Sequence, residues 1–217
     1  VVNDAAYLRA LAGSLSIFLP IAGVVAALMA VADNGNQILT PTWEILLFIA
    51  IIGLLDAAAG FVSIVVFTVG SILAYGQVPD LDQVRLLMAV FVIAVGPALL
   101  TTAFRALRKE PADSTESWWE RLSDLAIAPF MAGWSVATMV SVLPAVTGLT
   151  VNAANHVADF GVWIAVVAAL RVVLEEFVAR YYPQRLDTIN PTEIPEPGML
   201  QKSTALAIRY GIWVLFT

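Results

Sequence analysis

Residues 43–76 read WEILLFIAIIGLLDAAAGFVSIVVFTVGSILAYG, and this apolar run decides the kind of fold. A single helix of these 34 residues would be about 51 Å long, at about 1.5 Å per residue. The hydrocarbon core of a bilayer is only about 30 Å thick. The run is therefore one strongly tilted helix or two shorter segments. Asp56 and Gly60 weaken helix continuity, which favours a broken hairpin or re-entrant form.

The composition places the whole chain in a membrane. Hydrophobic residues make up 60% of it and charged residues 13%, whereas soluble domains carry about 25% charged residues. The lipid bilayer is the expected partner, and nucleic acid is not. The absence of Cys excludes thiolate metal sites and cysteine nucleophiles. Basic residues that are mostly Arg, together with spans rich in Ala and Val, favour a bacterial inner (plasma) membrane.

Further apolar spans predict an all-α, polytopic transmembrane helix bundle over residues 1–183, with about five or six membrane segments. Prolines interrupt residues 184–201, so we expect a non-helical cytoplasmic linker there. Residues 202–217 begin a further membrane helix that is cut short. Because the chain starts without Met and stops inside an apolar run, we expect it to be a piece of a longer protein.

A capping box, Ser117-Trp118-Trp119-Glu120, predicts the start of an amphipathic helix near 117–128. The two Trp residues share one side of this helix with leucines, and charged residues take the other side. Paired Trp side chains suit the membrane interface, which favours a helix lying in the membrane plane. The alternative is a cap over the cytoplasmic ends of the other helices.

Basic residues set the expected topology. Loops 105–121 and 180–202 carry most of the Arg and Lys residues, so the positive-inside rule places both in the cytoplasm. Residues 33–44 and 150–159 contain neither Arg nor Lys and are expected outside. A broken hairpin in the long apolar run puts the amino end and Arg9 inside, whereas a single crossing puts them outside.

Asp56 is the first candidate for an intramembrane polar site, because an acid inside an apolar run costs a few kcal/mol and is usually retained for a reason. One interpretation is a proton or cation site that faces a cavity. The other, which we favour, is a cap on the second half of a broken helix. The carboxylate would then accept hydrogen bonds from the amides of Ala58 or Ala59.

A second group of candidate charges ends the last complete span. Arg171 and Glu175 are four residues apart and share a helix face, and so do Glu176 and Arg180. We favour helix-end charges that extend to the membrane interface. The alternative is a gate or a docking latch at the cytoplasmic end of the bundle.

Small residues recur at every fourth position in two neighbouring spans. Such ladders predict a close helix crossing, because they let two backbones approach each other. Since a short loop joins the two spans, we expect one tightly packed antiparallel pair. The ladder residues are Gly133, Ala137 and Ser141 in one span and Gly161, Ala165 and Ala169 in the next.

The hexapeptide Glu175-Glu176-Phe177-Val178-Ala179-Arg180 resembles the first motif, Glu-Glu-x-x-x-Arg, of the CAAX-type intramembrane metalloproteases. In that family, later helices supply histidines that complete a metal or water-activating site. The lone His of this chain, His156, lies upstream and on the expected outer side, and none follows Arg180. The resemblance therefore implies a metalloprotease-like protein only if histidines lie beyond Thr217.

The function classes that remain are mostly non-catalytic. No phosphate-binding loop, dinucleotide-binding glycine pattern or zinc-protease motif is present, so we expect no enzyme, cofactor or metal site. We favour a multi-pass membrane-anchoring or scaffold subunit of a larger bacterial envelope complex, associated with other membrane subunits or with copies of itself. The alternative is a transporter or channel-type domain whose broken helix around Asp56 lines the pathway. The metalloprotease is a third and weaker hypothesis.

Overall fold

The computed structural model describes residues 5–35, 37–105, 118–148 and 151–189, and every regular element within them is a helix. This confirms the all-α prediction. The elements in chain order are α1 (Ala6–Ala12), η1 (Gly13–Ile17), α2 (Phe18–Asp33), α3 (Trp43–Leu55), α4 (Ala57–Tyr75), α5 (Leu81–Arg105), α6 (Trp118–Thr147), η2 (Asn152–His156), α7 (Val157–Tyr181) and α8 (Pro183–Ile189).

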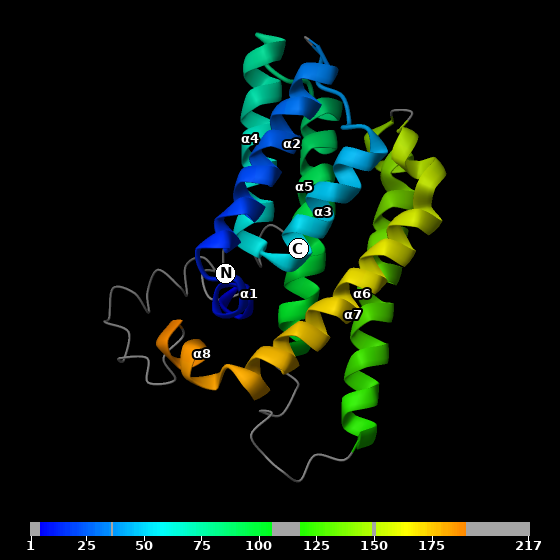
Figure 1. Cartoon of the computed structure of the whole chain (residues 1–217). Coiled ribbons are helices and arrows are strands. Elements are labelled where there is room, and N and C mark those ends of the chain that lie inside the picture. Colours follow the sequence, from blue (N-terminus) through cyan, green and yellow to red (C-terminus); the bar gives the residue numbers. More distant parts are fainter. Residues whose placement is uncertain (1–4, 36, 106–117, 149–150, 190–217) are drawn as a thin grey trace, which may run out of the picture.

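The longer helices run up and down a single bundle (Figure 1). We call the end of the bundle that holds α1 and α8 the lower end, and the opposite end the upper end. From the lower end α2 rises, α3 descends, α4 rises, α5 descends, α6 rises and α7 descends (Figure 1). Both outer ends of the α3–α4 pair therefore lie at the upper end. The break between these two helices lies deep in the bundle.

Four helical stretches of the described chain are long and apolar enough to cross a membrane. They are Ala6–Asp33, Ala57–Tyr75, Leu125–Thr147 and Asn152–Tyr181. Large apolar side chains cover their outer faces, for example Phe18 on α2, Trp134 on α6 and Trp163 on α7. A soluble protein rarely exposes so much contiguous apolar surface, whereas lipid tails solvate it well.

Helix α3 lies at the centre of the bundle and contacts α2, α4, α5 and α7. After Glu44 its side chains are apolar on every side, which is the pattern of a buried helix. Leu46, Ile49 and Leu54 are fully buried there, together with Ile93 from α5 and Ile164 from α7. The hydrophobic core thus surrounds α3, the short helix of 13 residues that ends just before Asp56.

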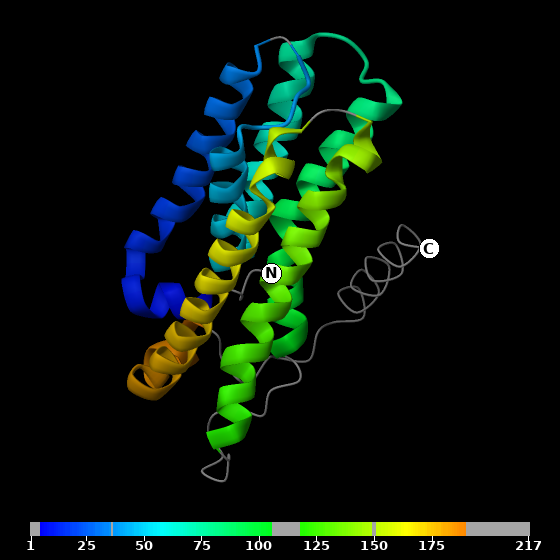
Figure 2. The same cartoon turned by 90° about the vertical axis from the view of Figure 1, so that its right-hand side faces the viewer.

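Helices α6 and α7 form the closest helix pair and lie side by side along their length (Figure 2). A Cβ added at Gly133 would lie 2.4 Å from the carbonyl oxygen of Gly161 and 2.9 Å from the Cβ of Ala165. A Cβ added at Gly161 would lie 3.3 Å from the Cβ of Ala137. These four residues of the two ladders therefore allow the backbones to meet.

The last residue of each ladder lies outside this tight contact zone. Ser141 is exposed, and its hydroxyl donates a hydrogen bond to the carbonyl oxygen of Thr138 over 2.8 Å. Ala169 is partly exposed. The ladder spacing of four residues is slightly longer than one helical turn of about 3.6 residues, so a ladder drifts around the helix and leaves the interface.

The amphipathic helix expected near 117–128 is not a separate element. Residues 118–128 are the first turns of α6, which continues without interruption to Thr147. No glycine or proline lies between Trp118 and Pro129, so nothing in the local sequence stops a helix that has begun. Ser117, the first residue of the capping box, lies outside the described residues.

The linker expected over 184–201 also differs from the prediction at its start. Residues 183–189 form α8, a short helix at the lower end of α7. Pro183 is the first residue of this helix, where the missing N–H costs nothing, and the next proline comes only at Pro191. Residues 190–201 and the apolar segment 202–217 lie outside the described part of the chain.

Candidate functional site at the helix break

The long apolar run is broken at Asp56, whose extended backbone separates α3 from α4. Its carboxylate accepts hydrogen bonds from the amide of Ala58 at 2.9 Å and from that of Ala59 at 3.3 Å. Asp56 is therefore the N-cap of α4, although only 7% of it is exposed. Two of the amides that begin this helix are thus satisfied by the residue that interrupts the run.

The carbonyl oxygens that end α3 are satisfied by residues from far away in the sequence. The hydroxyl of Tyr7, on α1, donates to the carbonyl oxygen of Leu55 over 2.7 Å. The guanidinium of Arg171, on α7, donates to the carbonyl oxygen of Leu54. In hydrocarbon an unsatisfied backbone group costs several kcal/mol, so a break at this depth needs such partners. The chain supplies donors and acceptors for both sides of its own break.

Arg171 is almost wholly buried, with 2% of its surface exposed. Its Nε donates to a carboxylate oxygen of Glu175 over 2.9 Å, and 11% of the Glu175 side chain is exposed. The guanidinium also lies 5.7 Å from the centre of the Tyr7 ring, within the range of a cation–π contact. An acid, an aromatic face and a backbone carbonyl together compensate the buried charge.

The helix backbones around the break are in direct contact. A Cβ added at Gly60 would lie 2.3 Å from the Cα of Gly53. A Cβ added at Gly53 would lie 2.3 Å from the carbonyl oxygen of Ala94 on α5. Glycine is required where backbones approach this closely. This contact leaves no space for a ligand between α3, α4 and α5 at these glycines.

Helix α1 closes the break from the lower end. Tyr7 and Ala10 of α1 are buried against Val178 of α7, and Leu186 and Ile189 of α8 pack on the same cluster. A side-chain nitrogen of Arg185 on α8 lies 3.5 Å from the carbonyl oxygen of Ala10. The amino-terminal helix is therefore held by both elements that end the chain's described part.

The structure brings together three of the five candidate polar residues. Asp56, Arg171 and Glu175 all lie at the break, whereas Glu176 and Arg180 are exposed on α7. Arg180 forms no ion pair with any described residue, so the second expected pair is not made. Sequence analysis missed Tyr7 because it lies 48 residues from its partner, and no local pattern marks such a contact.

His156 lies at the upper end, far from the Glu175 end of α7 (Figure 1). Its Nδ1 lies 3.0 Å from a carboxylate oxygen of Asp159, and its ring stacks on Trp43 with centroids 4.1 Å apart. No group of three or more His, Cys, Asp or Glu residues that could hold a metal ion occurs in the described chain. Glu175 thus has no histidine near it there.

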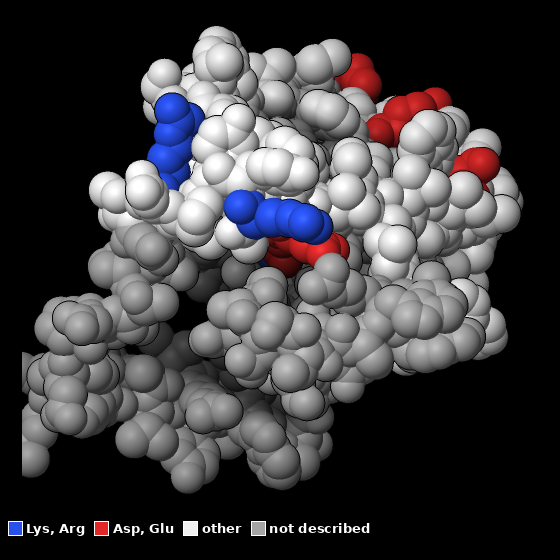
Figure 3. Space-filling model, turned by 60° about the horizontal axis from the view of Figure 1, so that its bottom comes forward, with Lys and Arg blue, Asp and Glu red and all other residues white. Residues whose placement is uncertain are grey.

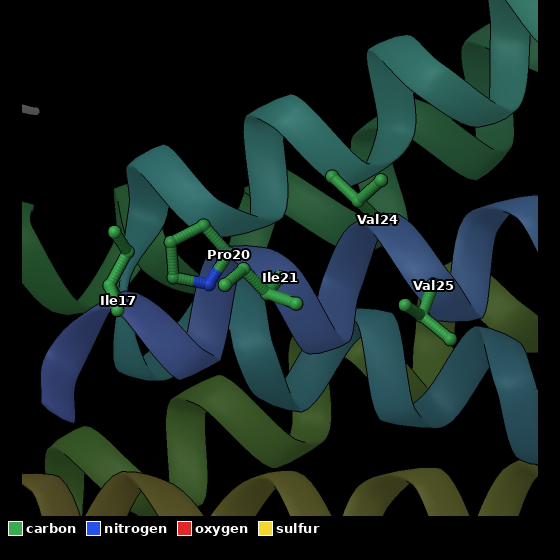
Figure 4. A pocket seen from close by; sticks show the side chains of 5 residues that line it. All are labelled: Ile17, Pro20, Ile21, Val24 and Val25. Carbon is green, nitrogen blue, oxygen red and sulfur yellow. The ribbon is translucent and has the colours of Figure 1, made fainter.

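Two shallow hollows lie away from the break. The first is on the outer face of α2 and is wholly apolar; Ile17, Pro20, Ile21, Val24 and Val25 line it (Figure 4). The second lies at the upper end, between Pro144 and the residues of η2. Neither hollow includes Asp56 or Arg171.

Comparisons with protein-family models, curated proteins and solved structures found no match.

Proposed function

We propose that this chain is a multi-pass membrane-anchoring or scaffold domain of a larger bacterial envelope complex, in which α3 and α4 form a re-entrant hairpin with a sealed tip. One observation carries the proposal: the chain's own buried groups satisfy the backbone at the break. Asp56 caps the amides of α4, while Tyr7 and Arg171 bind the last carbonyls of α3. A pathway for a solute would need polar groups that are open to water instead.

The length of α4 supports a re-entrant hairpin. Its 19 residues span about 28 Å at about 1.5 Å per residue, nearly the full thickness of the hydrocarbon core. With both outer ends of the hairpin at the upper end, the break would lie inside the hydrocarbon, nearer to its lower boundary than to its upper one. There α1 can reach it from the interface, as the bond from Tyr7 to Leu55 requires.

The distribution of charge supports a cytoplasmic lower end. Arg9, Arg180 and Arg185 belong to elements of the lower end, whereas Arg85 lies near the start of α5, at the upper end. By the positive-inside rule these charges support the proposal that loops 105–121 and 180–202 are cytoplasmic. Partners would then be other membrane subunits or further copies of the chain. They would contact its exposed helix faces, because the tight α6–α7 contact is already used within the chain.

A transporter or channel-type domain is the second candidate. A buried carboxylate at an interrupted helix favours it, because discontinuous helices commonly form transport sites. The direct contact between Gly53 and Gly60 argues against a water-filled pathway at that point. The two functions therefore differ in one measurable property, which is the access of water to the break.

Cysteine accessibility scanning measures this property, and the absence of native Cys makes the background clean. Single cysteines at Ala57, Ala59 and Ser63 would be probed in intact membranes with a membrane-impermeant thiol reagent. Gln77 at the upper end and Gln184 at the lower end are exposed control positions. Protection of the three buried positions, with labelling of each control from its own side, supports the anchoring domain. Labelling of the buried positions would overturn it and favour transport.

A further inference from the structure

Three arginines gather at the lower end from three different helices. Arg9 lies on α1, Arg180 in the last turn of α7, and Arg185 on α8. Arg180 and Arg185 are exposed and Arg9 is partly exposed. None of the three forms an ion pair with a residue of the described chain. Their guanidinium groups therefore offer donors that the described chain leaves without an anionic acceptor.

The packing of the three helices holds these arginines in one region. Helix α1 contacts both α7 and α8 through the Tyr7–Ala10–Val178 cluster. The Arg185 side chain extends over this junction, with a nitrogen 3.5 Å from the carbonyl oxygen of Ala10. Its guanidinium lies 5.5 Å from the centre of the Tyr182 ring. With the lower end brought forward, the visible basic side chains are separated from each other by uncharged surface, and acidic atoms lie beside one of them (Figure 3).

This junction coincides with a boundary of the apolar surface. The candidate span that includes α7 ends at Tyr181, and the one that includes α2 begins at Ala6. Tyr181 and Tyr182 are both exposed next to Arg180. Aromatic residues of this kind concentrate at the level of lipid head groups. The three arginines thus lie at the depth where lipid phosphates are found.

The acidic side chains of α7 near Arg180 do not form ion pairs with the three arginines. Glu175 is bound to the buried Arg171 and is mostly buried itself. Glu176 already has an interaction of its own within the chain. Because neither acid forms an ion pair with Arg9, Arg180 or Arg185, an external anion can complement these guanidinium groups. Guanidinium groups bind phosphate oxygens through two parallel hydrogen bonds, which makes Arg the preferred residue for such ligands.

We propose that the junction of α1, α7 and α8 binds the head group of an anionic phospholipid of the inner leaflet. Arg180 and Arg185 hold its phosphate, and Arg9 adds a third positive charge from α1. The bound lipid joins α1 to the end of α7, and so it stabilises the element that closes the break. The proposal rests on the membrane placement argued above but not on whether the break is dry.

Native mass spectrometry of the full chain in detergent tests the proposal directly. The protein is mixed with equal concentrations of phosphatidylglycerol or phosphatidylcholine, and the lipid molecules that remain bound are counted. Phosphatidylglycerol should be retained and phosphatidylcholine lost, because only the first carries a net negative charge. Equal retention of both lipids would overturn the proposal. The cysteine labelling of the break is a separate measurement, so failure of one proposal is distinguishable from failure of the other.

Variants locate the site. Removing one guanidinium, in Arg180→Gln or Arg185→Gln, should weaken phosphatidylglycerol binding about fivefold. This factor corresponds to about 1 kcal/mol of binding free energy, which is what one basic residue near an anionic surface contributes. Arg85→Gln, at the upper end, is the matched control and should bind as the wild type does. An unchanged affinity in the Arg180→Gln/Arg185→Gln double variant would contradict the assignment. Helix content from circular dichroism identifies a variant that fails to fold.

Two further arms separate the remaining explanations. Arg185→Lys keeps the charge but loses the paired donors, so it should fold like the wild type and bind phosphatidylglycerol with intermediate affinity. Wild-type affinity in this variant would exclude paired contacts from Arg185. Inorganic phosphate at the same concentration should not raise the melting temperature, whereas phosphatidylglycerol should. Equal stabilisation by both would assign the site to free phosphate and overturn the lipid.

Discussion

The guanidinium of Arg171 donates a hydrogen bond to the carbonyl oxygen of Leu54, although the two residues are 117 positions apart in the chain. This bond connects the middle of α7 with the end of α3. It explains why a charged side chain is buried among apolar helices, since the carbonyl at the break has no partner in its own helix. The membrane cost of the charge is offset by the bond to Glu175 and by the satisfied backbone.

We predict that Arg171→Met destabilises the protein by about 3–5 kcal/mol, because the substitution leaves Glu175 without its buried ion-pair partner. The Leu54 carbonyl loses its donor in the same variant. The free energy of unfolding in mixed micelles, followed by circular dichroism, measures the effect. A variant as stable as the wild type would show that the buried contact has no structural role.

The double variant Arg171→Met/Glu175→Met is the matched control. It removes both members of the ion pair together, so we expect a smaller loss of about 1–3 kcal/mol, mainly because the Leu54 carbonyl loses its donor. Losses that simply add in the double variant would indicate that the two side chains act independently.

Two substitutions at Asp56 distinguish a capping role of its carboxylate from a proton-carrying role. We predict that Asp56→Ala lowers the unfolding free energy by about 0.5–2 kcal/mol, because the amides of Ala58 and Ala59 lose their acceptor. Asp56→Asn keeps an acceptor oxygen of the same size and should stay close to the wild type. Micelle unfolding measures both variants. In reconstituted vesicles, an Asp56→Asn variant that abolishes a pH-dependent flux would instead support transport.

The sequence predicted local features of the site better than its long-range ones. The cap at Asp56 involves residues two and three positions on, and Arg171 and Glu175 are one helical turn apart. Such contacts follow from helix geometry alone. The bond from Tyr7 to Leu55 spans 48 residues and depends on how α1 docks, which periodicity does not encode. The sequence therefore predicts the cap on α4, as one of two interpretations, but not the donors that satisfy the carbonyls of α3.

Helix ends were predicted less well than helix starts. The capping box and paired Trp residues suggested a separate element near 117–128, yet the structure continues the helix from Trp118 to Thr147. A cap specifies where a helix starts, but where it stops depends on breakers and on packing further along. The prolines likewise predict a non-helical linker over the whole of residues 184–201. Residues 184–189 contain no proline, however, and they lie in α8.

The contact between Gly53 and Gly60 should tolerate no side chain. We predict that Gly60→Ala destabilises the protein by about 1–3 kcal/mol, because the new Cβ would lie 2.3 Å from the Cα of Gly53 and the backbones must separate. Gly96→Ala is the matched control. Its Cβ would make ordinary contacts, 3.7 Å from the end of the Met139 side chain and 4.0 Å from Cγ1 of Val92. Because alanine is also the better helix former, this variant should be as stable as the wild type or more so. Melting temperatures in micelles compare the two, and equal losses would contradict the close approach.

The α6–α7 crossing predicts an efficient engineered disulfide between Ala137→Cys and Gly161→Cys. A Cβ at Gly161 would lie 3.3 Å from the Cβ of Ala137, close to the separation of about 3.5–4.5 Å found in disulfides. Because Asp159 lies between the two cysteines, a protease that cuts before Asp gives fragments that stay joined until a reductant is added. Thr138→Cys/Val162→Cys, at two exposed positions, is the control pair and should give separate fragments. Separate fragments from the first pair as well would mean that α6 and α7 do not cross at these small residues.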